Sequence, residues 1–387
     1  MERRFVVVGA GVFGSWTAYI LRRLGHEVLL LDQYGPANSR ASSGGETRII
    51  RAGYGPKQVY TNLAVRALPL WVSFFEKIGR PLLYRTGVLW LDGDDSPYVQ
   101  GSDDALRSAG VDHELLSQEE IERRYPQMRL ESHVAGLFEP QAGAILARQA
   151  VHALVDDFVN LGGVYHHAEI MQPAGNGHLA AVRTASGEQI HGDAFVFACG
   201  PWLGKVFPDL LGSKVIPSRQ EVIFFGIPPG DKRFSTPQLP IWIDCSGPRK
   251  VYGLPDLDGR GFKVACDVHG EPFDPDNGER IVSQKGVSRA REYVTRRFPA
   301  LADAPIVETR VCQYENTDNV DFLIDRHTDF ENLWLVGGGS GHGFKHGPAI
   351  GEYAAARVTG SATPAIEERF SIASKQEFDP RILRSSL

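Results

Sequence analysis

The segment Arg4-Phe-Val-Val-Val8, followed by Gly9-Ala-Gly11-Val-Phe-Gly14, decides the fold of this chain. A short continuous apolar run is typical of a strand that is buried on both faces in a parallel sheet. The glycine spacing permits a tight turn at Gly9, close approach of the backbone to a pyrophosphate at Gly11 and helix-to-strand packing at Gly14. The sequence therefore predicts a strand, a phosphate-binding turn and a helix, in this order.

An acidic residue at the end of the next strand completes this unit. The helix is expected to end at Gly25, and the apolar run Val28–Leu31 predicts a second strand that ends at Asp32. A carboxylate at this place accepts a hydrogen bond from a ribose hydroxyl, while the helix N-terminus faces the phosphates. The unit predicts binding of an adenosine dinucleotide, and by itself it does not distinguish NAD from FAD.

A second strand-turn-helix pattern near the end of the chain favours FAD. The apolar strand Leu333–Val336 runs into the glycine-rich turn 337–343, and a helix is expected over 349–358. A nicotinamide enzyme has no evident need for such a unit. In a flavin enzyme the helix N-terminus can face the pyrimidine edge of the isoalloxazine and stabilise the negative charge of the reduced ring.

Two regions with a different pattern separate these units. Alternating strands, with one helix near 279–298 whose arginine-rich part is expected to face water, favour a mixed or antiparallel sheet. We therefore expect an α/β protein in which a second domain is inserted in two pieces. The expected dinucleotide-binding domain comprises residues 1–82, 145–215 and 318–387, and the expected substrate domain comprises 83–144 and 216–317.

The composition excludes several classes of protein. With 387 residues, 42% hydrophobic and 23% charged, the chain is neither disordered nor limited to one small core. A net charge of −6 argues against a nucleic-acid partner. Four cysteines without a CxxC pair predict neither a disulfide framework nor a zinc site, and no apolar run is long enough for a membrane span or a secretory signal. We expect a cytoplasmic protein that is a monomer.

Six further motifs occur in the order found in one known family. They are Thr47-Arg-Ile-Ile-Arg51, Tyr252-Gly-x-Pro255, Gly261-x-Lys263, Cys312-x-Tyr314-x-x-Thr317, Phe322-x-Ile324-Asp325 and Ser340-Gly-His-Gly-Phe-Lys345. With the glycine turn and Asp32, they resemble the amine-oxidising flavoproteins of the D-amino acid oxidase superfamily, most closely the monomeric sarcosine oxidase and pipecolate oxidase branch. The resemblance spans nearly the whole chain, and it implies a glutathione-reductase-like FAD-binding domain of the Rossmann type.

The resemblance implies four catalytic residues. Arg51 and Lys345 are expected to bind the carboxylate of the substrate, with Tyr252 nearby. An arginine fork and a lysine point charge would orient the substrate so that the adjacent C–H faces flavin N5. Lys263 corresponds to the lysine that such oxidases place beside the flavin, where a positive charge favours electron transfer to oxygen.

The resemblance also implies the residues that hold FAD. Cys312 matches the position at which this branch links FAD covalently through its 8α-methyl, although a buried free cysteine is the alternative. No metal site is expected, because the glycines around His342 argue against a helix that would pair it with His346. The expected cofactor-binding residues are Gly9, Gly11, Val12, Phe13, Gly14, Asp32, Ser42, Ser43, Thr47, Arg48, Cys312, Gly339, Gly341, His342, Gly343, Phe344 and Lys345.

Three positions depart from the sarcosine oxidases. The segment 43–46 reads Ser-Gly-Gly-Glu where those enzymes have His-His-Gly-Asp, and Asp267 stands where they have a histidine four residues after the lysine. Gly339 replaces a bulky aromatic residue. These departures argue against sarcosine itself as the substrate and leave a different carboxylated amine.

The sequence thus predicts FAD-dependent oxidation of a small primary or secondary amine or amino acid, such as an N-alkyl or cyclic amino acid. A hydride would pass to flavin N5, the imine would hydrolyse, and molecular oxygen would reoxidise the flavin to give hydrogen peroxide. One alternative is a flavin dehydrogenase that passes electrons to a quinone or a protein. The others are a protein that binds FAD without catalysis and a nicotinamide dehydrogenase.

Overall fold

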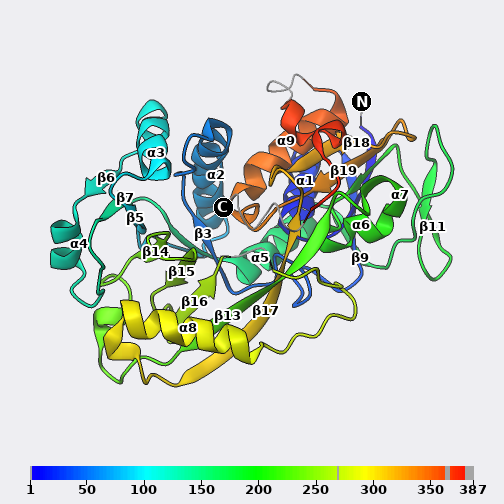
Figure 1. Ribbon diagram of the computed structural model, residues 1–387. Coiled ribbons are helices and arrows are strands. Elements are labelled where there is room, and N and C mark those ends of the chain that lie inside the picture. Colours follow the sequence, from blue (N-terminus) through cyan, green and yellow to red (C-terminus); the bar gives the residue numbers. More distant parts are fainter. Residues whose placement is uncertain (1, 268–269, 362–366, 380–387) are drawn as a thin grey trace.

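The computed structural model describes residues 2–267, 270–361 and 367–379, and within them two large sheets organise the chain (Figure 1). The first sheet has six strands in the order β18-β19-β12-β1-β2-β9, all parallel to their neighbours except β18. In that order they are Leu323–Arg326, Leu333–Gly337, Ala194–Phe197, Arg4–Val8, Glu27–Asp32 and Val164–His167. Strand β1 lies inside this sheet with Phe5, Val6 and Val7 fully buried, as the sequence predicts.

The turn after β1 has the geometry that its glycines suggest. Gly9 has a φ of +106°, and a Cβ there would lie 2.3 Å from the carbonyl oxygen of Ala198. A Cβ on Gly14 would lie 1.9 Å from the carbonyl oxygen of Gly9. Helix α1 (Val12–Arg23) can therefore approach the sheet only because these positions have no side chain.

Helices surround α1 and cover this part of the molecule. The helix α1 packs against α9 (Gly347–Thr359) and α5 (Ala147–Asn160), and α2 (Gln58–Lys77) packs against α9. The predicted helix over 349–358 is thus confirmed in slightly longer form. The shorter elements are α3 (Pro97–Ser108), α4 (Gln118–Arg124), α6 (Leu203–Val206), α7 (Pro208–Leu211), β10 (Ala181–Arg183), β11 (Gln189–His191) and the 3-10 helices η1 (Gly200–Trp202), η2 (Lys232–Phe234), η3 (Pro299–Leu301), η4 (Phe344–His346), η5 (Glu368–Phe370) and η6 (Ile372–Ser374).

The second sheet has eight strands in the order β17-β13-β16-β15-β14-β5-β7-β6, and it is mixed because only β14 and β5 run parallel. In that order they are Ile306–Asn316, Ile216–Phe225, Phe262–Cys266, Val251–Leu254, Ile241–Asp244, Val88–Gly93, Val134–Glu139 and Glu114–Leu116. The predicted α/β fold with an inserted mixed sheet is confirmed.

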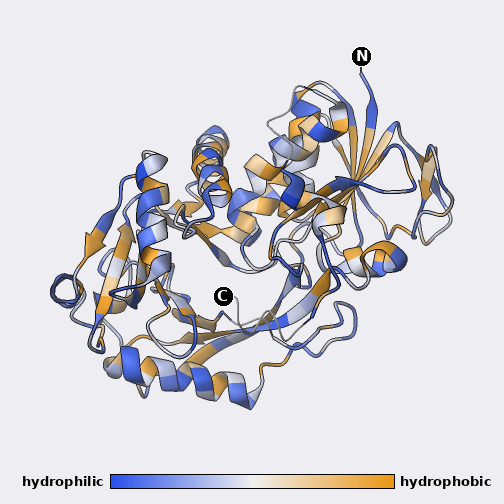
Figure 2. Cartoon of the chain, turned by 45° about the horizontal axis from the view of Figure 1, so that its top comes forward, coloured by the Kyte–Doolittle hydropathy of each residue, from blue (hydrophilic) through white to orange (hydrophobic). Residues whose placement is uncertain are grey.

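Helix α8 (Gln284–Arg297) covers one face of the second sheet, and its outer side is mostly hydrophilic (Figure 2). Its apolar residues pack into the core that contains Trp242 and Phe262. The expectation that its arginines face water is wrong at Arg297, whose side chain is fully buried and donates to Asp244 Oδ2 at 2.8 Å. A buried partner carboxylate outweighs the tendency of a charged helix face to stay in water.

A third sheet joins the two regions. Its strands are β3 (Thr47–Ile50), β8 (Gly143–Leu146) and β4 (Leu83–Tyr84), with β8 in the middle. The strands of the two large sheets fall within the ranges expected for the two domains, whereas this sheet contains strands from both. The domain boundaries therefore stay a prediction.

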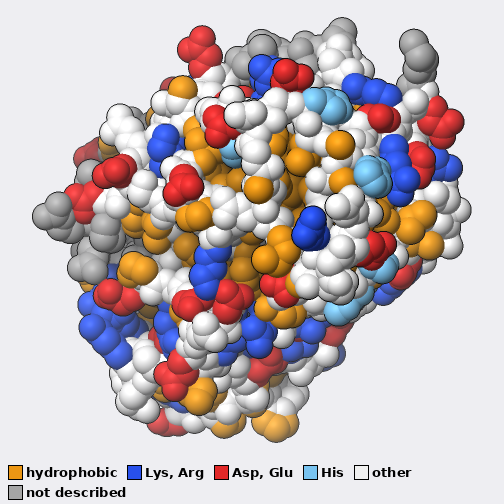
Figure 3. Space-filling view, turned by 90° about the vertical axis from the view of Figure 1, so that its right-hand side faces the viewer, with side chains coloured by type: hydrophobic (Ala, Val, Ile, Leu, Met, Phe, Trp, Pro, Cys, Tyr) orange, Lys and Arg blue, Asp and Glu red, His pale blue; other side chains and the backbone are white. Residues whose placement is uncertain are grey.

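The surface shows no single-sign charged face in the view of Figure 3. On that face, hydrophobic side chains gather at the centre, and acidic and basic side chains are interspersed around them. None of the helices in the described residues is both long and apolar enough to cross a membrane. Within the same residues there is no cluster of three or more His, Cys, Asp or Glu side chains that could hold a metal ion.

Candidate active site

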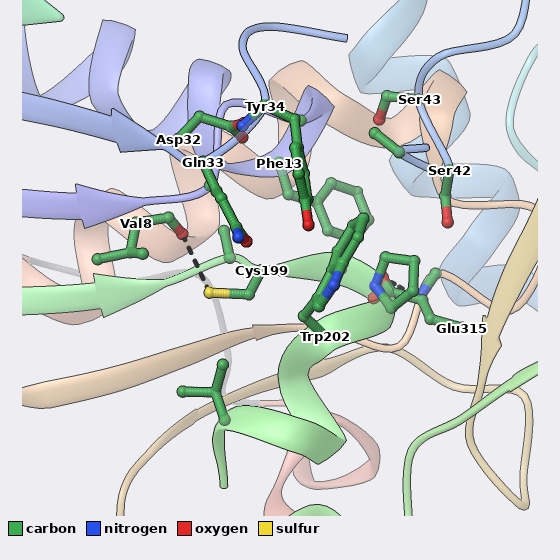
Figure 4. Close-up of a pocket in the computed structure, with 18 of the residues that line it drawn as sticks. Val8, Phe13, Asp32, Gln33, Tyr34, Ser42, Ser43, Cys199, Trp202 and Glu315 are labelled. Atoms are coloured by element: carbon green, nitrogen blue, oxygen red, sulfur yellow. Dashed lines mark hydrogen bonds between the residues drawn. The ribbon is translucent and has the colours of Figure 1, made fainter. Parts of the chain in front are cut away.

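A cavity of about 400 Å³ lies at the carboxyl ends of β1 and β2. Its walls come from the β1-α1 turn, strand β17 and the glycine-rich turn after β19, which are more than 300 residues apart at the extremes (Figure 4). Most of the expected cofactor-binding residues line it. These are Gly9, Gly11, Val12, Phe13, Asp32, Ser42, Ser43, Arg48, Gly339, Gly341, Gly343 and Phe344.

The remaining expected cofactor-binding residues lie outside this cavity. Gly14 packs α1 on the sheet, and Thr47 lies on β3. His342 stacks on Phe322 with ring centroids 4.9 Å apart, and its Nε2 lies 3.0 Å from the carbonyl oxygen of Val320. Cys312 lines a smaller neighbouring cavity, and Lys345 lies in a second cluster described below.

Asp32 shapes the end of the cavity that the sequence assigns to the ribose. Its Oδ2 accepts a hydrogen bond from the Ala10 N–H at 2.8 Å, and its Oδ1 accepts from the N–H groups of Tyr34 and Gly35, each at 2.8 Å. Burial raises its pKa, and these backbone bonds act in the opposite direction. The carboxylate therefore holds the chain after β2 in place while it borders the cavity.

The groups around the cavity fit a phosphate-containing dinucleotide. Helix α1 begins at the cavity, and its N-cap residue, Gly11, has no side chain that could accept a hydrogen bond from the first turn. The helix N-terminus therefore presents partial positive charge to the cavity. Ser43 Oγ accepts from the Val12 N–H at 3.0 Å. Among the described residues, three buried polar atoms of side chains that line the cavity have no partner, namely Ser42 Oγ, Gln313 Oε1 and Glu315 Oε2, and burial raises the pKa of Glu315 to about 7. Such atoms fit a ligand that is rich in hydroxyl groups and oxygen acceptors.

A group of side chains outside this cavity places Arg51 and Lys345 against the same tyrosine, Tyr54. We call it the second cluster, and its other members are Trp90, Glu139, Lys250 and Asp267. The Arg51 guanidinium donates to the Gly53 carbonyl, and it lies 4.2 Å from the ring centroid of Tyr54 and 4.5 Å from that of Trp90. Lys345 Nζ donates to the Tyr54 hydroxyl at 2.9 Å. The two cations that the sequence predicts to bind a carboxylate thus flank a common side chain.

Two carboxylates accompany these cations. Both oxygens of Glu139 accept backbone bonds, from Ala52 N–H at 2.7 Å and from Gly53 N–H at 3.0 Å. Asp267 pairs with Lys250 Nζ at 3.2 Å and accepts from the Tyr314 hydroxyl at 3.1 Å. Burial raises the pKa of Glu139, and nearby Arg51 partly opposes this shift.

The charges in this cluster balance only when one of its basic side chains is neutral. Arg51, Lys250 and Lys345 are three cations when ionised, and Glu139 and Asp267 are two anions. Burial and the charge of Arg51 lower the pKa of Lys345 well below its ordinary value, whereas Asp267 and Glu139 act in the opposite direction. The cluster is therefore suited to one additional negative charge.

Lys263 lines the small cavity together with Cys312, the residue that is expected to link FAD. Its Nζ donates to the backbone oxygen of Thr47 at 3.2 Å and to Thr47 Oγ1 at 3.1 Å, and it lies 5.9 Å from the Tyr252 ring centroid. Burial and the charge of Arg48 lower the pKa of Lys263 to about 7. The Lys263 side chain is therefore only partly charged near neutral pH, whereas the family resemblance predicts a fixed positive charge.

Cys312 is held at this small cavity by a hydrogen bond from Arg48. Arg48 donates to Cys312 Sγ at 3.2 Å and to the Ser42 carbonyl at 2.8 Å. Lys263, Arg48 and Cys312 all line a cavity of about 20 Å³. Arg48 therefore lines both the large cavity and the small one.

Four side chains of the second cluster have no signal in the sequence. Tyr54, Trp90, Glu139 and Lys250 belong to no motif, and single residues of these types are more often part of the core or the surface. Asp267 is noticed only as a departure from a family pattern. Only the strand pairings that bring β5, β7, β14 and β15 together reveal this part of the site.

Most of the chain matches one protein family. The model of the FAD dependent oxidoreductase family, DAO, matches residues 4–357. The chain belongs to the DAO family. Its cofactor is accordingly FAD, which matches the cavity, and it is an oxidoreductase rather than a flavin-binding protein without catalysis.

Similar proteins cover most of this DAO-family chain. The human peroxisomal sarcosine oxidase is 30% identical over 354 residues, which is 90% of each chain. The monomeric sarcosine oxidase of Streptomyces avermitilis is 32% identical over 361 residues, which is 90% of this chain and 92% of the relative. The predicted resemblance to this branch is confirmed.

Solved structures show the same fold. The L-proline dehydrogenase from P. horikoshii has a TM-score of 0.83 at 21% identity, covering 96% of this chain and 97% of that one. NikD, an unusual amino acid oxidase essential for nikkomycin biosynthesis, has a TM-score of 0.78 at 23% identity, covering 96% and 98%. The two-sheet architecture is thus that of DAO-family oxidoreductases.

Proposed function

We propose that this protein oxidises a small amine that carries a carboxylate, an N-alkyl or cyclic amino acid, to the imine, with oxygen as the final acceptor and hydrogen peroxide as the second product. The observation that carries the proposal is the pair of basic side chains on Tyr54, the half-buried Arg51 and the buried Lys345. The names of relatives support it, since they include sarcosine oxidases and the N-methyl-L-tryptophan oxidase of Yersinia pestis, 27% identical over 382 residues.

The charge of the second cluster narrows the substrate class. With its groups ionised, the cluster has one positive charge in excess, so one carboxylate would balance it. A dicarboxylic substrate would bring an uncompensated buried charge, which is costly. Asp267 at the position of a histidine, and its ion pair with Lys250, make the surroundings differ from those of a sarcosine oxidase, so we do not propose sarcosine itself.

The proposed roles divide the chemistry between the two cavities and the cluster. Arg51 and Lys345 would hold the carboxylate, the α1 N-terminus with Ser43 would hold the pyrophosphate, and Asp32 would hold a ribose hydroxyl. When bound, FAD supplies the acceptor for the hydride that leaves the substrate. Cys312 is the proposed point of covalent attachment, and Lys263 would place a positive charge where oxygen reacts.

We propose in addition that the protein is a monomer in the cytoplasm. Monomeric sarcosine oxidases among the relatives support the first part. The compartment stays a prediction from the sequence, and the name of the human relative points to the peroxisome for that protein.

Matched pairs of substrates test the proposal. We expect pipecolate or proline to bleach the flavin absorbance without oxygen, and piperidine or pyrrolidine, which lack the carboxylate, to bleach it far more slowly. Equal bleaching by both members of a pair would contradict a carboxylate site. Under air, substrate turnover without hydrogen peroxide would favour a dehydrogenase with another acceptor.

A further inference from the structure

The hydrogen bonds of Lys345 leave one direction of its amino group free. Nζ donates to the Tyr54 hydroxyl and to the His342 carbonyl oxygen, both at 2.9 Å. Among residues 2–267, 270–361 and 367–379, no third acceptor contacts it. A neutral amine has two N–H groups and one lone pair, so these two bonds satisfy its donors and leave the lone pair unused.

The partners of Lys345 are consistent with a neutral amine. The Tyr54 hydroxyl accepts from Lys345 and lies 2.7 Å from His346 Nε2, so it can donate its own proton to this ring. Burial keeps Tyr54 in its protonated form by raising its pKa, and it lowers the pKa of His346 and of His342 well below the ordinary value. Each of these neighbours is therefore neutral, and none is an acid strong enough to protonate Lys345.

The charged groups that face Lys345 come from four other elements or loops. Arg51 and Lys250 disfavour a charge on its amino group, and Asp267 and Glu139 favour one. Both carboxylates have their own partners, Lys250 and Tyr314 for Asp267 and two backbone N–H groups for Glu139. With Lys345 neutral, the cluster holds two cations and two anions, and its charge is zero.

We infer that Lys345 is the base that takes the proton from the amino group of the substrate, a role that rests on the function proposed above. An amino acid in water carries an ammonium group, and hydride can leave the neighbouring carbon only once the nitrogen has a free electron pair. The N–H bond of the ammonium breaks, its electron pair stays on the substrate nitrogen, and the proton bonds to the lone pair of Lys345 Nζ. The new lysine ammonium then pairs with the substrate carboxylate.

This transfer needs no proton from the solvent and no other reactant. A zwitterion of zero charge enters a cluster of zero charge, and the proton only moves from one nitrogen to the other. Arg51 cannot perform the step because a guanidinium does not deprotonate in proteins. Asp267 and Glu139 are already engaged in the bonds described above.

Counting protons on ligand binding tests the inference. The oxidised holoenzyme would be mixed with cyclohexanecarboxylate in a weak buffer at about pH 8, roughly two units below the ordinary lysine pKa of about 10.4. A carboxylate without an amine must draw about one proton from solution to charge Lys345. The zwitterion 2-methylpipecolate brings its own proton, so we expect a net uptake close to zero. It keeps a CH2 group next to nitrogen, so protons are counted before any bleaching of the flavin.

The variant Lys345→Arg is the matched control. It keeps the positive charge but has no lone pair to protonate, because the arginine pKa is above about 12. We expect cyclohexanecarboxylate to bind it without proton uptake, and 2-methylpipecolate to release about one proton into solution. An indicator dye reports the protons, and the perturbed flavin spectrum reports the binding.

The outcomes separate the two proposals. Failure of cyclohexanecarboxylate to bind the wild-type enzyme would contradict the carboxylate site itself, and the inference with it. Binding to the wild-type enzyme without proton uptake, or proton release with the zwitterion, would overturn only the role of Lys345 as a base. Uptake that persists in Lys345→Arg would assign the proton to another group.

Discussion

Lys263 is a site residue whose charge changes with pH near neutrality. Burial and Arg48 lower its pKa to about 7, so the side chain is charged below this value and neutral above it. Because a positive charge favours electron transfer to oxygen, we expect the reoxidation rate of the reduced enzyme to fall as the pH rises through about 7. Stopped-flow reoxidation at a series of pH values measures this.

The variant Lys263→Met should remove that pH dependence. At low pH we expect reoxidation slower by at least about 100-fold, the scale of losing one electrostatic group at a reacting centre, and nearly normal anaerobic reduction. Lys232→Met, at an exposed lysine, is the control and should behave as the wild type. Wild-type reoxidation in Lys263→Met would exclude Lys263 from the oxygen reaction.

Cys312 is the second residue with a direct test. Its sulfur lies at the wall of the small cavity, 3.2 Å from an Arg48 nitrogen, where the family resemblance predicts a covalent link to FAD. Acid precipitation of the wild type should leave the yellow colour in the pellet, and Cys312→Ala should release it. Cys266→Ala should retain the colour. Flavin that washes out of the wild type would remove the covalent link but leave the enzyme class unchanged.

At the scale of elements, the site depends on two segments that each deliver one cation. Arg51 directly follows β3, and Lys345 lies in η4, where the Trp71 indole N–H donates to its backbone oxygen at 3.0 Å. Removal of either side chain takes a charged partner from a desolvated carboxylate, a loss of roughly 1.5 to 3 kcal/mol. We therefore expect Arg51→Ala and Lys345→Ala to weaken substrate binding by about 10- to 150-fold.

The concentration dependence of anaerobic flavin bleaching measures this weakening. Arg80→Ala, at an exposed arginine just after α2, is a suitable control because its side chain donates to the exposed Gln149. An unchanged concentration dependence in both site variants would show that the carboxylate binds elsewhere.

Features formed by neighbouring residues could be predicted from the sequence, whereas ion pairs between distant elements could not. The β1-α1 turn and Asp32 lie within one short stretch, and their spacing alone encodes the local geometry, so they were predictable. Lys250 and Asp267 pair only because β15 and β16 are antiparallel neighbours. A lone lysine is usually a surface residue, and no local pattern marks Lys250 as half-buried and paired with a carboxylate. Arg297 escapes prediction for the same reason, since it lies on helix α8 and its partner Asp244 lies on strand β14.

At the scale of the whole molecule, FAD binding should be linked to global unfolding. The large cavity is lined by residues from Val8 to Phe344, so it exists only when the first and last parts of the chain meet in one sheet. A ligand that binds only the folded state adds about 2.7 kcal/mol of stability at a free concentration of 100 times its Kd. The reversible binding needed for this test is expected in Cys312→Ala.

We therefore expect added FAD to raise the unfolding midpoint of flavin-depleted Cys312→Ala in proportion to the logarithm of its concentration. Secondary structure from both sheets should be lost in the same transition. NAD at equal concentration should leave the midpoint unchanged, because we expect the glycine-rich turn after β19 to contact a flavin ring, which NAD lacks. Equal stabilisation by NAD would show that the adenosine half accounts for the binding. A midpoint insensitive to FAD would show that the cavity does not hold the cofactor, since binding confined to the folded state must shift unfolding.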